Sequence, residues 1–421
     1  MTAGYPSQAH GNYVHRVPHL SAQKLGLALT WLTLATSSAV FAEPAPYDAL
    51  MIGLMALLPL LGLTAFSTRV FLFFIAWLVI GATGLIATAQ SSNLDISAKH
   101  TAVTIYLSIS AVLIAAFVRN NPERHTRIIV SGLLFASLVA VLAGCVGYFN
   151  MMPGANELFT LYGRMRGTFK DPNVFGPFMV PALLYCLHSM ATARAGRTIM
   201  MSLLAGLFCF ALLVSFSRGA GLNAGIALLV YAFMVFIVAR SNLFRLKLLV
   251  LVFFAACGAV LVTAAAMEID SIGELLRERA SFTLSYDTGP EGRFGGQLRA
   301  LDIITRHPMG IGAQEFGRAL IGQDVHNVYL SMFLNAGWIG GFLYFAIVMT
   351  TLIAGFCHAL RTIPTQGIFI VMLASFAGLA AEGWIVDTDH WRHFYVIMGL
   401  IWGLMLANGP ARHPGPRQHF S

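Results

Sequence analysis

Long apolar stretches separated by short polar connections run through almost the whole chain. A transmembrane helix needs about 20 consecutive apolar residues, and the sequence contains twelve candidate stretches. They are residues 25–42, 48–66, 70–90, 101–118, 128–149, 174–192, 198–216, 219–239, 247–267, 338–357, 367–386 and 393–408. This pattern predicts an all-α polytopic membrane protein with about twelve transmembrane helices.

One long polar segment interrupts the pattern between the ninth and the tenth stretch. It covers residues 268–337 and separates a block of nine predicted spans, 25–267, from a block of three, 338–408. Residues 1–24 and 409–421 form polar tails. Because so apolar a chain keeps few polar residues outside the membrane, we interpret the long segment as a functional loop.

Short helices are expected inside this loop. Arg293–Arg306 has the pattern of a helix and is followed by the helix-ending pair His307-Pro308. Asp324 is positioned to cap a second short helix. A glycine-containing segment that starts at Gly337 is expected to bend this helix into the next span.

The composition agrees with a membrane protein. Hydrophobic residues make up 57% of the 421 residues and charged residues only 10%, whereas soluble domains carry about 25% charge. Residues 25–42 could be taken for a signal peptide, but we interpret them as the first span because they are long enough to cross a bilayer. The chain has no Walker A, Rossmann or kinase motif, and we predict no cofactor and no nucleic-acid partner.

Lysines and arginines gather in alternate connections, counted from the N-terminus. One set of connections contains only a single carboxylate, Glu123. The cations of this set are Arg16, Lys24, Arg69, Arg119, Arg124, Arg127, Arg194, Arg197, Arg240, Arg245, Lys247, Arg361, Arg412 and Arg417. Because cytoplasmic loops are enriched in Lys and Arg, we predict that this set, with both termini, is cytoplasmic.

Four cations break this rule in short connections on the predicted outer side. They are Arg164, Arg166, Lys170 and Arg218. Exceptions to a strong rule tend to be functional. The alternative is that they contact lipid headgroups or pair with nearby carboxylates such as Glu157 and Asp171.

The segment Gly163–Pro177 carries three of these cations. Two glycines bracket Arg164 and Arg166, so the backbone can approach a ligand closely. Guanidinium groups bind phosphate oxygens in a bidentate manner, and Lys170 adds a point charge. The pattern favours a phosphate-binding loop; the alternative is a re-entrant loop capped by local hydrogen bonds.

The fourth cation, Arg218, stands where two apolar stretches meet with almost no connection, in Ser217-Arg218-Gly219-Ala220. A charge costs roughly 2.5–3.5 kcal/mol at the centre of a bilayer and less near its edge. We therefore expect Arg218 to face a polar cavity and to pair with an anion. Snorkelling to the headgroups is the alternative.

In the long loop, helical spacing places Arg299, Asp302 and Arg306 on one face and Arg293 on another. Arg299 is expected to pair with Asp302. Arg293 is then the better candidate for binding an anionic ligand.

His326 is the candidate for acid–base chemistry. If Asp324 caps a helix, His326 lies in its first turn, where the positive helix end disfavours the imidazolium form. A neutral imidazole beside arginines is a suitable general base for a sugar hydroxyl. The alternative is a surface histidine that bonds a loop carbonyl.

The last outer connection contains His390 and His393 near Asp387 and Asp389. Their spacing could suit a metal ion. The connection has no third histidine and no cysteine, so we predict no metal site.

At these residues the chain resembles the superfamily of O-antigen ligases and O-antigen polymerases, bacterial envelope glycosyltransferases. The matching elements are Arg164-x-x-Gly167-x-Phe169-x-x-Pro172-Asn173, Ser217-Arg218-Gly219, Pro308-x-Gly310-x-Gly312 and His326-Asn327-x-Tyr329-Leu330. One departure concerns Arg293, because the family usually has Trp four residues later and this chain has Gln297.

The resemblance implies an enzyme of the bacterial inner membrane that needs no metal. It would transfer a glycan from undecaprenyl diphosphate to an acceptor in the periplasm, with residues 268–337 as a periplasmic catalytic loop. Three candidate catalytic residues follow, His326, Arg218 and Arg164. Candidate ligands of the diphosphate are Arg166, Arg293, Lys170 and Asn327.

The acceptor stays open at this point. A ligase would use lipid A-core, a polymerase would use another lipid-linked glycan for O-antigen or exopolysaccharide, and a protein acceptor is a third version. A transporter of lipid-linked sugars is the alternative from another class. It predicts charges in mid-span and discontinuous helices, whereas most stretches here lack charge.

Overall fold

The computed structural model describes residues 19–192, 195–239, 241–243, 245–246, 292–322 and 324–407. Its long helices are α1 (His19–Ala35), α2 (Pro46–Leu60), α3 (Thr68–Thr88), α4 (Leu94–Asn120), α5 (Pro122–Tyr148), α7 (Pro172–Thr192), α8 (Ala195–Val214), α9 (Arg218–Val238), α12 (Arg293–Arg306), α13 (Val328–Ala359), α14 (Gln366–Glu382) and α15 (Arg392–Ala407). Shorter elements are α6 (Ala155–Phe159), strands β1 (Thr160–Leu161) and β2 (Arg164–Met165), and a π-helix at Phe316–Ile321.

The predicted all-α membrane architecture is confirmed. Six described helices are long and apolar enough to cross a membrane: α3, α4, α5, α8, α9 and α13. Each predicted stretch except 247–267, which lies outside the described residues, overlaps a described helix. Several of these helices are shorter, such as α2, α14 and α15, so the structure does not establish the count of twelve spans.

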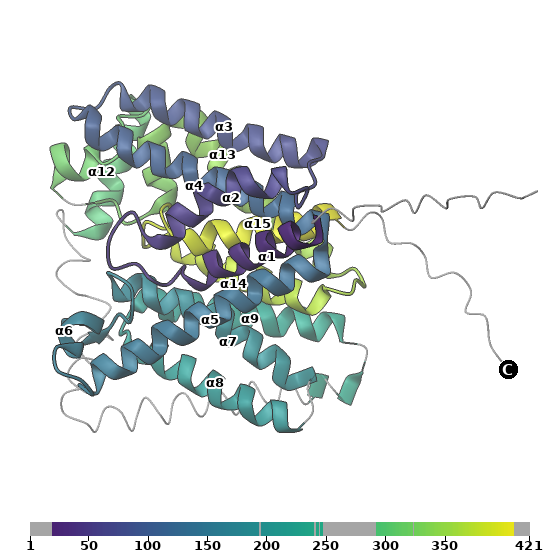
Figure 1. Ribbon diagram of the computed structural model, residues 1–421. Coiled ribbons are helices and arrows are strands. Elements are labelled where there is room, and N and C mark those ends of the chain that lie inside the picture. Colours follow the sequence, from purple (N-terminus) through teal and green to yellow (C-terminus); the bar gives the residue numbers. More distant parts are fainter. Residues whose placement is uncertain are drawn as a thin grey trace, which may run out of the picture.

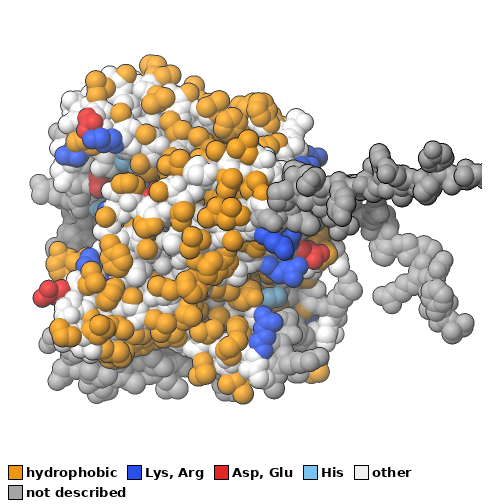
Figure 2. Space-filling view, in the orientation of Figure 1, with side chains coloured by type: hydrophobic (Ala, Val, Ile, Leu, Met, Phe, Trp, Pro, Cys, Tyr) orange, Lys and Arg blue, Asp and Glu red, His pale blue; other side chains and the backbone are white. Residues whose placement is uncertain are grey.

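The long helices lie side by side in one bundle with two distinct ends (Figure 1). At one end, Lys24 of α1, Asn121 between α4 and α5, and Thr365 before α14 line a common cavity. The opposite end carries α6, α12 and the connection between α14 and α15, and we call it the site end. Hydrophobic side chains cover the middle of the face in Figure 2, while charged side chains lie towards the two ends.

Helices α14 and α15 are largely buried, with 12 of 17 and 11 of 16 residues buried. The glycines of α15 allow close packing on α4: a Cβ at Gly403 would lie 2.8 Å from the carbonyl oxygen of Ala115. Small residues permit such close approach between membrane helices. The connection that precedes α15 is therefore joined to a helix that packs tightly against α4.

The bend predicted at Gly337 is confirmed. Gly337 has φ 66° and ψ −173° inside α13, a conformation that glycine adopts without steric cost. The turn before the π-helix fits into this break, because Pro308 O accepts from Trp338 N at 2.8 Å and Leu334 O accepts from Ile311 N at 2.8 Å. The turn that follows α12 is thereby fixed to α13.

The predicted cap of this helix is wrong. Helix α13 begins at Val328, and its N-cap is Asn327 rather than Asp324. The Asn327 Oδ1 accepts from the backbone N–H groups of Tyr329 and Leu330 at 3.1 and 3.2 Å. An asparagine directly before the helix satisfies these N–H groups, so His326 precedes the helix instead of lying in its first turn.

Candidate active site

Arg164 connects the first motif to the second. It lies in a two-stranded antiparallel hairpin, where it pairs with Leu161. Its side chain is buried, with Nε donating to the carbonyl oxygen of Ser215 and Nη2 to Oδ1 of Asn173, both at 2.8 Å. The predicted catalytic Arg164 therefore holds the corner between α8 and α9.

This corner presents Arg218 at the start of a helix. Phe216 takes a left-handed conformation, φ 45°, and the Ser217 hydroxyl accepts from Ala220 N at 3.2 Å as the N-cap of α9. Arg218 is the first residue of α9 and is partly buried. A helix N-terminus attracts anions, so its field adds to the charge of Arg218.

The end of α14 brings this corner next to His326. On one side, a Cβ at Gly219 would lie 2.6 Å from Oε1 of Glu382. On the other, the Gly383 carbonyl oxygen accepts from Val328 N at 2.8 Å. The Ser-Arg-Gly element therefore faces Glu382, and the helix that follows the His-Asn element bonds the next residue, Gly383.

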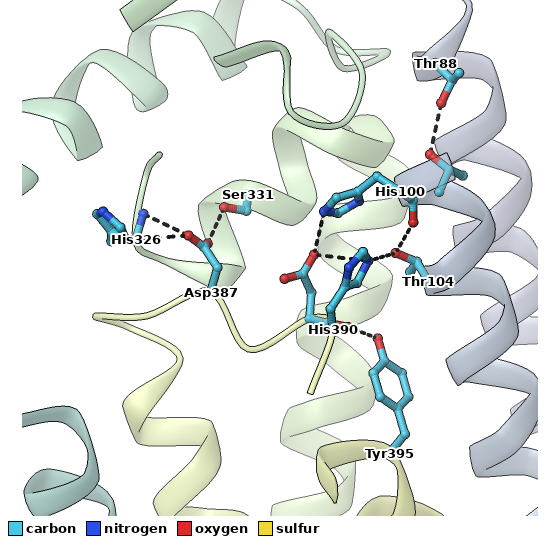
Figure 3. Close-up of polar contacts among 10 residues, drawn as sticks. Thr88, His100, Thr104, His326, Ser331, Asp387, His390 and Tyr395 are labelled. Atoms are coloured by element: carbon cyan, nitrogen blue, oxygen red, sulfur yellow. Dashed lines mark hydrogen bonds and ion pairs between the residues drawn. The ribbon is translucent and has the colours of Figure 1, made fainter. Parts of the chain in front are cut away.

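His326 has a carboxylate partner, Asp387, from the connection between α14 and α15 (Figure 3). Asp387 Oδ2 accepts from the His326 backbone N at 3.1 Å and lies 3.9 Å from the ring Nδ1. His326 itself has a positive φ, 51°. The carboxylate therefore holds the backbone of His326 by a hydrogen bond, and the ring lies near it without a direct hydrogen bond.

Asp387 is itself held in place. Its Oδ1 accepts from the Ser331 hydroxyl at 2.6 Å. Shielding from water raises the pKa of the Asp387 carboxyl to about 7, and the negative charge of Asp389 acts in the same direction. The hydrogen bond from Ser331 acts against this rise, because it stabilises the charged carboxylate.

Arg166 and Lys170 shape the loop that follows the hairpin. Arg166 donates to the carbonyl oxygens of Glu157 at 3.1 Å and Lys170 at 3.3 Å. The exposed Lys170 ammonium lies 3.5 Å from Glu43 in the connection between α1 and α2. These contacts hold the loop together, and binding of a ligand by Arg166 and Lys170 stays a prediction.

Asn327 is almost fully buried, with 3% of its surface exposed. Its side-chain oxygen serves as the cap of α13, as described above. Because the oxygen is used in this way, the contact with the diphosphate that is predicted for Asn327 would have to come from its side-chain nitrogen, Nδ2.

Helix α12 lies over the same connection between α14 and α15. Gln297 Nε2 donates to the carbonyl oxygen of Trp384 at 3.4 Å. Arg293 is the first residue of α12, and its side chain lies outside the described residues. The pairing predicted for Arg299 is wrong, because Asp302 bonds Arg306 at 2.8 Å, one turn later on the same helix.

His390 and His393 separate from each other in the fold. His393 is buried, with its ring 5.4 Å from that of Phe178. His390 faces α4, where its Nε2 lies 3.0 Å from the Thr104 hydroxyl. His390, just before α15, therefore faces α4, whereas His393, in the first turn of α15, faces Phe178.

Asp387 is the candidate site residue that the sequence motifs missed. The chain has only 18 Asp and Glu residues, and two of them, Asp387 and Asp389, lie in one short connection opposite the loop of His326. Two carboxylates so close together in an apolar chain were the sequence feature that could have indicated Asp387. The sequence does not show that Asp387 contacts His326, because the two residues are 61 positions apart.

The assembled groups suit displacement at a carbon that carries an anionic leaving group. An imidazole oriented by a carboxylate can accept a proton from a hydroxyl. Guanidinium groups and a helix N-terminus can stabilise charge that develops on phosphate oxygens. Gly219, next to Arg218, and Val328, two residues after His326, both contact the end of α14.

Comparison with known proteins agrees with this chemistry. Residues 202–345 match the family model described as O-antigen ligase. This stretch includes the Ser217-Arg218-Gly219 element, Arg293 and His326, whereas Arg164 precedes it. No curated protein matches the chain at a significant level. The match confirms the resemblance indicated by the motifs and assigns residues 202–345 to the O-antigen ligase and polymerase superfamily of membrane enzymes.

Proposed function

We propose that the protein is an O-antigen ligase, a glycosyltransferase that moves a glycan from undecaprenyl diphosphate to lipid A-core. The observation that supports this most directly is that Asp387 bonds His326, while its neighbour Val386 would lie 3.4 Å from a Cβ at Gly219, the residue after Arg218. A base and an anion-binding group are the two functions that such a transfer needs.

In the proposed reaction, the acceptor hydroxyl oxygen attacks the anomeric carbon of the glycan. The bond from this carbon to the diphosphate oxygen breaks, and the diphosphate leaves with the electron pair. His326 accepts the hydroxyl proton, and Asp387 stabilises the imidazolium that forms. Direct displacement inverts the configuration at the anomeric carbon.

Arg218 at the N-terminus of α9 is proposed as the main group that stabilises the leaving diphosphate. Arg164 keeps the corner in place through Ser215 and Asn173, and Arg166, Arg293, Lys170 and Asn327 are the further candidate ligands. Because charge develops on phosphate oxygens only as the bond breaks, these contacts favour the transition state.

A polymerase of the same superfamily is the alternative, because the groups described above act on the donor and not on the acceptor. Purified protein in liposomes would receive a lipid-linked glycan and either lipid A-core or a second lipid-linked glycan. A ligase forms product only with lipid A-core. Product only with the second glycan would identify a polymerase instead.

The same assay tests the proposed base. We expect His326→Ala to lower turnover at least 100-fold, since general bases contribute about 10²–10⁴-fold. His307→Ala is the matched control, because His307 is an exposed histidine at the end of α12. Near-normal turnover of His326→Ala would refute the mechanism.

We also propose that the site end faces the periplasm of a bacterial inner membrane, with both termini in the cytoplasm. The support is the distribution of Lys and Arg along the chain. In a cysteine-free background, Asp95→Cys at the site end should react with an impermeant maleimide in spheroplasts. Glu123→Cys at the opposite end should stay unlabelled until the membrane is opened, and the reverse pattern would invert the topology.

A further inference from the structure

Two imidazoles and a carboxylate meet beside the candidate active site, at a place where the motifs assign no role. His100 comes from the first turns of α4, and Asp389 and His390 come from the connection before α15. One potential ligand atom from each residue lies within 4.8 Å of the others. Figure 3 shows the rings of His100 and His390 next to each other, and their centroids are 3.9 Å apart.

The distances in this cluster are too long for direct hydrogen bonds. Asp389 Oδ2 lies 3.6 Å from Nε2 of His100 and 4.0 Å from Nε2 of His390. Ligands of a tetrahedral ion with bonds of about 2.0–2.2 Å are separated by roughly 3.3–3.6 Å. The His100 distance to Asp389 already falls at the end of this range, and the His390 side chain would have to move closer to Asp389 for all three groups to reach one ion.

The cluster is mostly shielded from water but still accessible. The exposed side-chain fractions are 13% for His100, 7% for Asp389 and 30% for His390. His100 and Asp389 line a small cavity that also contains Asp387 and Ser331. An ion could enter through this cavity, which lies between the cluster and the partner of His326.

The kind of ligand indicates the kind of ion. Imidazole nitrogen suits Zn²⁺ and related first-row metals, whereas Mg²⁺ and Ca²⁺ prefer oxygen ligands. Two histidines with one carboxylate leave room for water as a further ligand. We propose that His100, Asp389 and His390 bind a divalent transition-metal ion, for which Zn²⁺ is the probe.

This ion would be a positioning element, because its ligands come from α4 and from the connection that carries Asp387. Asp387 lies two residues before Asp389. By holding Asp389, the ion would also hold the Asp387 carboxylate next to His326. The consequence for Asp387 rests on the proposed function, whereas binding of the ion does not. Without the ion, Nε2 of His390 bonds the Thr104 hydroxyl at 3.0 Å, and the ion would replace this bond.

The test is calorimetric titration of Zn²⁺ into full-length protein purified in detergent without a polyhistidine tag. We expect one site per chain and a higher unfolding temperature with Zn²⁺, since an ion that binds the folded state stabilises it. His100→Ala and His390→Ala should weaken binding at least tenfold and abolish the shift. His307→Ala, which removes an exposed histidine elsewhere, should retain both.

A measurement on the wild-type protein covers the case in which these variants do not fold. Co²⁺ in the same site should give the visible absorption of a low-coordinate complex with nitrogen and oxygen ligands, and Zn²⁺ should displace it. No saturable binding, or binding that His100→Ala and His390→Ala leave unchanged, would overturn the proposal. His326→Ala should still bind Zn²⁺, so loss of transfer and loss of binding remain separate results.

Discussion

Two carboxylates in one short connection have different surroundings. Asp387 faces His326 and the Ser331 hydroxyl, next to the corner that carries Arg218. Asp389, two residues later, is more deeply buried and faces His100 and His390 on the side of α4. The difference shows that a single connection joins two regions: the Asp387 side, which holds the proposed chemistry, and the Asp389 side, which holds the connection against the bundle.

The largest difference between the Asp387 side and the Asp389 side is expected when each aspartate is replaced by asparagine. Asp387→Asn removes the charge that would stabilise the His326 imidazolium, so we expect transfer to fall about 100-fold or more. Asp389→Asn should lower transfer less than Asp387→Asn does and should weaken Zn²⁺ binding at least tenfold. Turnover in liposomes and calorimetry distinguish the two variants.

The exposed Asp95 provides the control for this pair. It lies at the site end, and its ion-pair partner within the described part of the chain is Lys99, at 2.6 Å. Asp95→Asn should leave both readouts within twofold of the wild type. If Asp387→Asn behaved like Asp95→Asn, the Asp387 side would have no role in transfer.

The Asp387 side also depends on Arg164. Arg164→Ala would leave the Ser215 carbonyl and the Asn173 amide without their buried partner, and each unsatisfied group costs about 1–3 kcal/mol. We expect a lower unfolding temperature together with lower transfer. Arg164→Lys should restore only part of both, because an ammonium cannot reproduce the two separate bonds of the guanidinium.

A smaller effect, caused only by steric overlap, is expected where α9 contacts α14. A Cβ at Gly219 would lie 2.6 Å from Glu382 Oε1, so Gly219→Ala should destabilise the fold by about 1–3 kcal/mol. Gly221 lies on the same helix, and a Cβ there would meet nothing within 4 Å. Equal unfolding temperatures for Gly219→Ala and Gly221→Ala would contradict the packing described for the end of α14.

The smallest effect is expected for Lys170. Its ion pair with Glu43 is largely exposed, and exposed pairs contribute about 0–1 kcal/mol. Lys170→Ala should therefore leave the unfolding temperature almost unchanged. A clear rise in KM for the lipid-linked donor, with stability unchanged, would show that Lys170 binds the diphosphate rather than supporting the loop.

Local patterns were sufficient for the elements and for single candidate residues. Apolar length located the helices because a span must cover the membrane with apolar side chains. The bend at Gly337 followed from a glycine between two helical stretches, and the polar corner at Arg218 followed from a charge between two spans. The local pattern failed at Asp324 and Asn327, because two polar residues three positions apart could each cap the helix and only the backbone geometry selects Asn327.

The partners of these residues depended on how the helices pack. His326 and Asp387 are 61 positions apart, Arg164 and Ser215 are 51 apart, and Thr104 and His390 are 286 apart. The last connection lacks a third histidine in sequence, yet packing of α15 on α4 supplies His100. Hydrophobic periodicity reports which face of a helix is buried but not which helix covers it, so these groupings were decided by the tertiary structure.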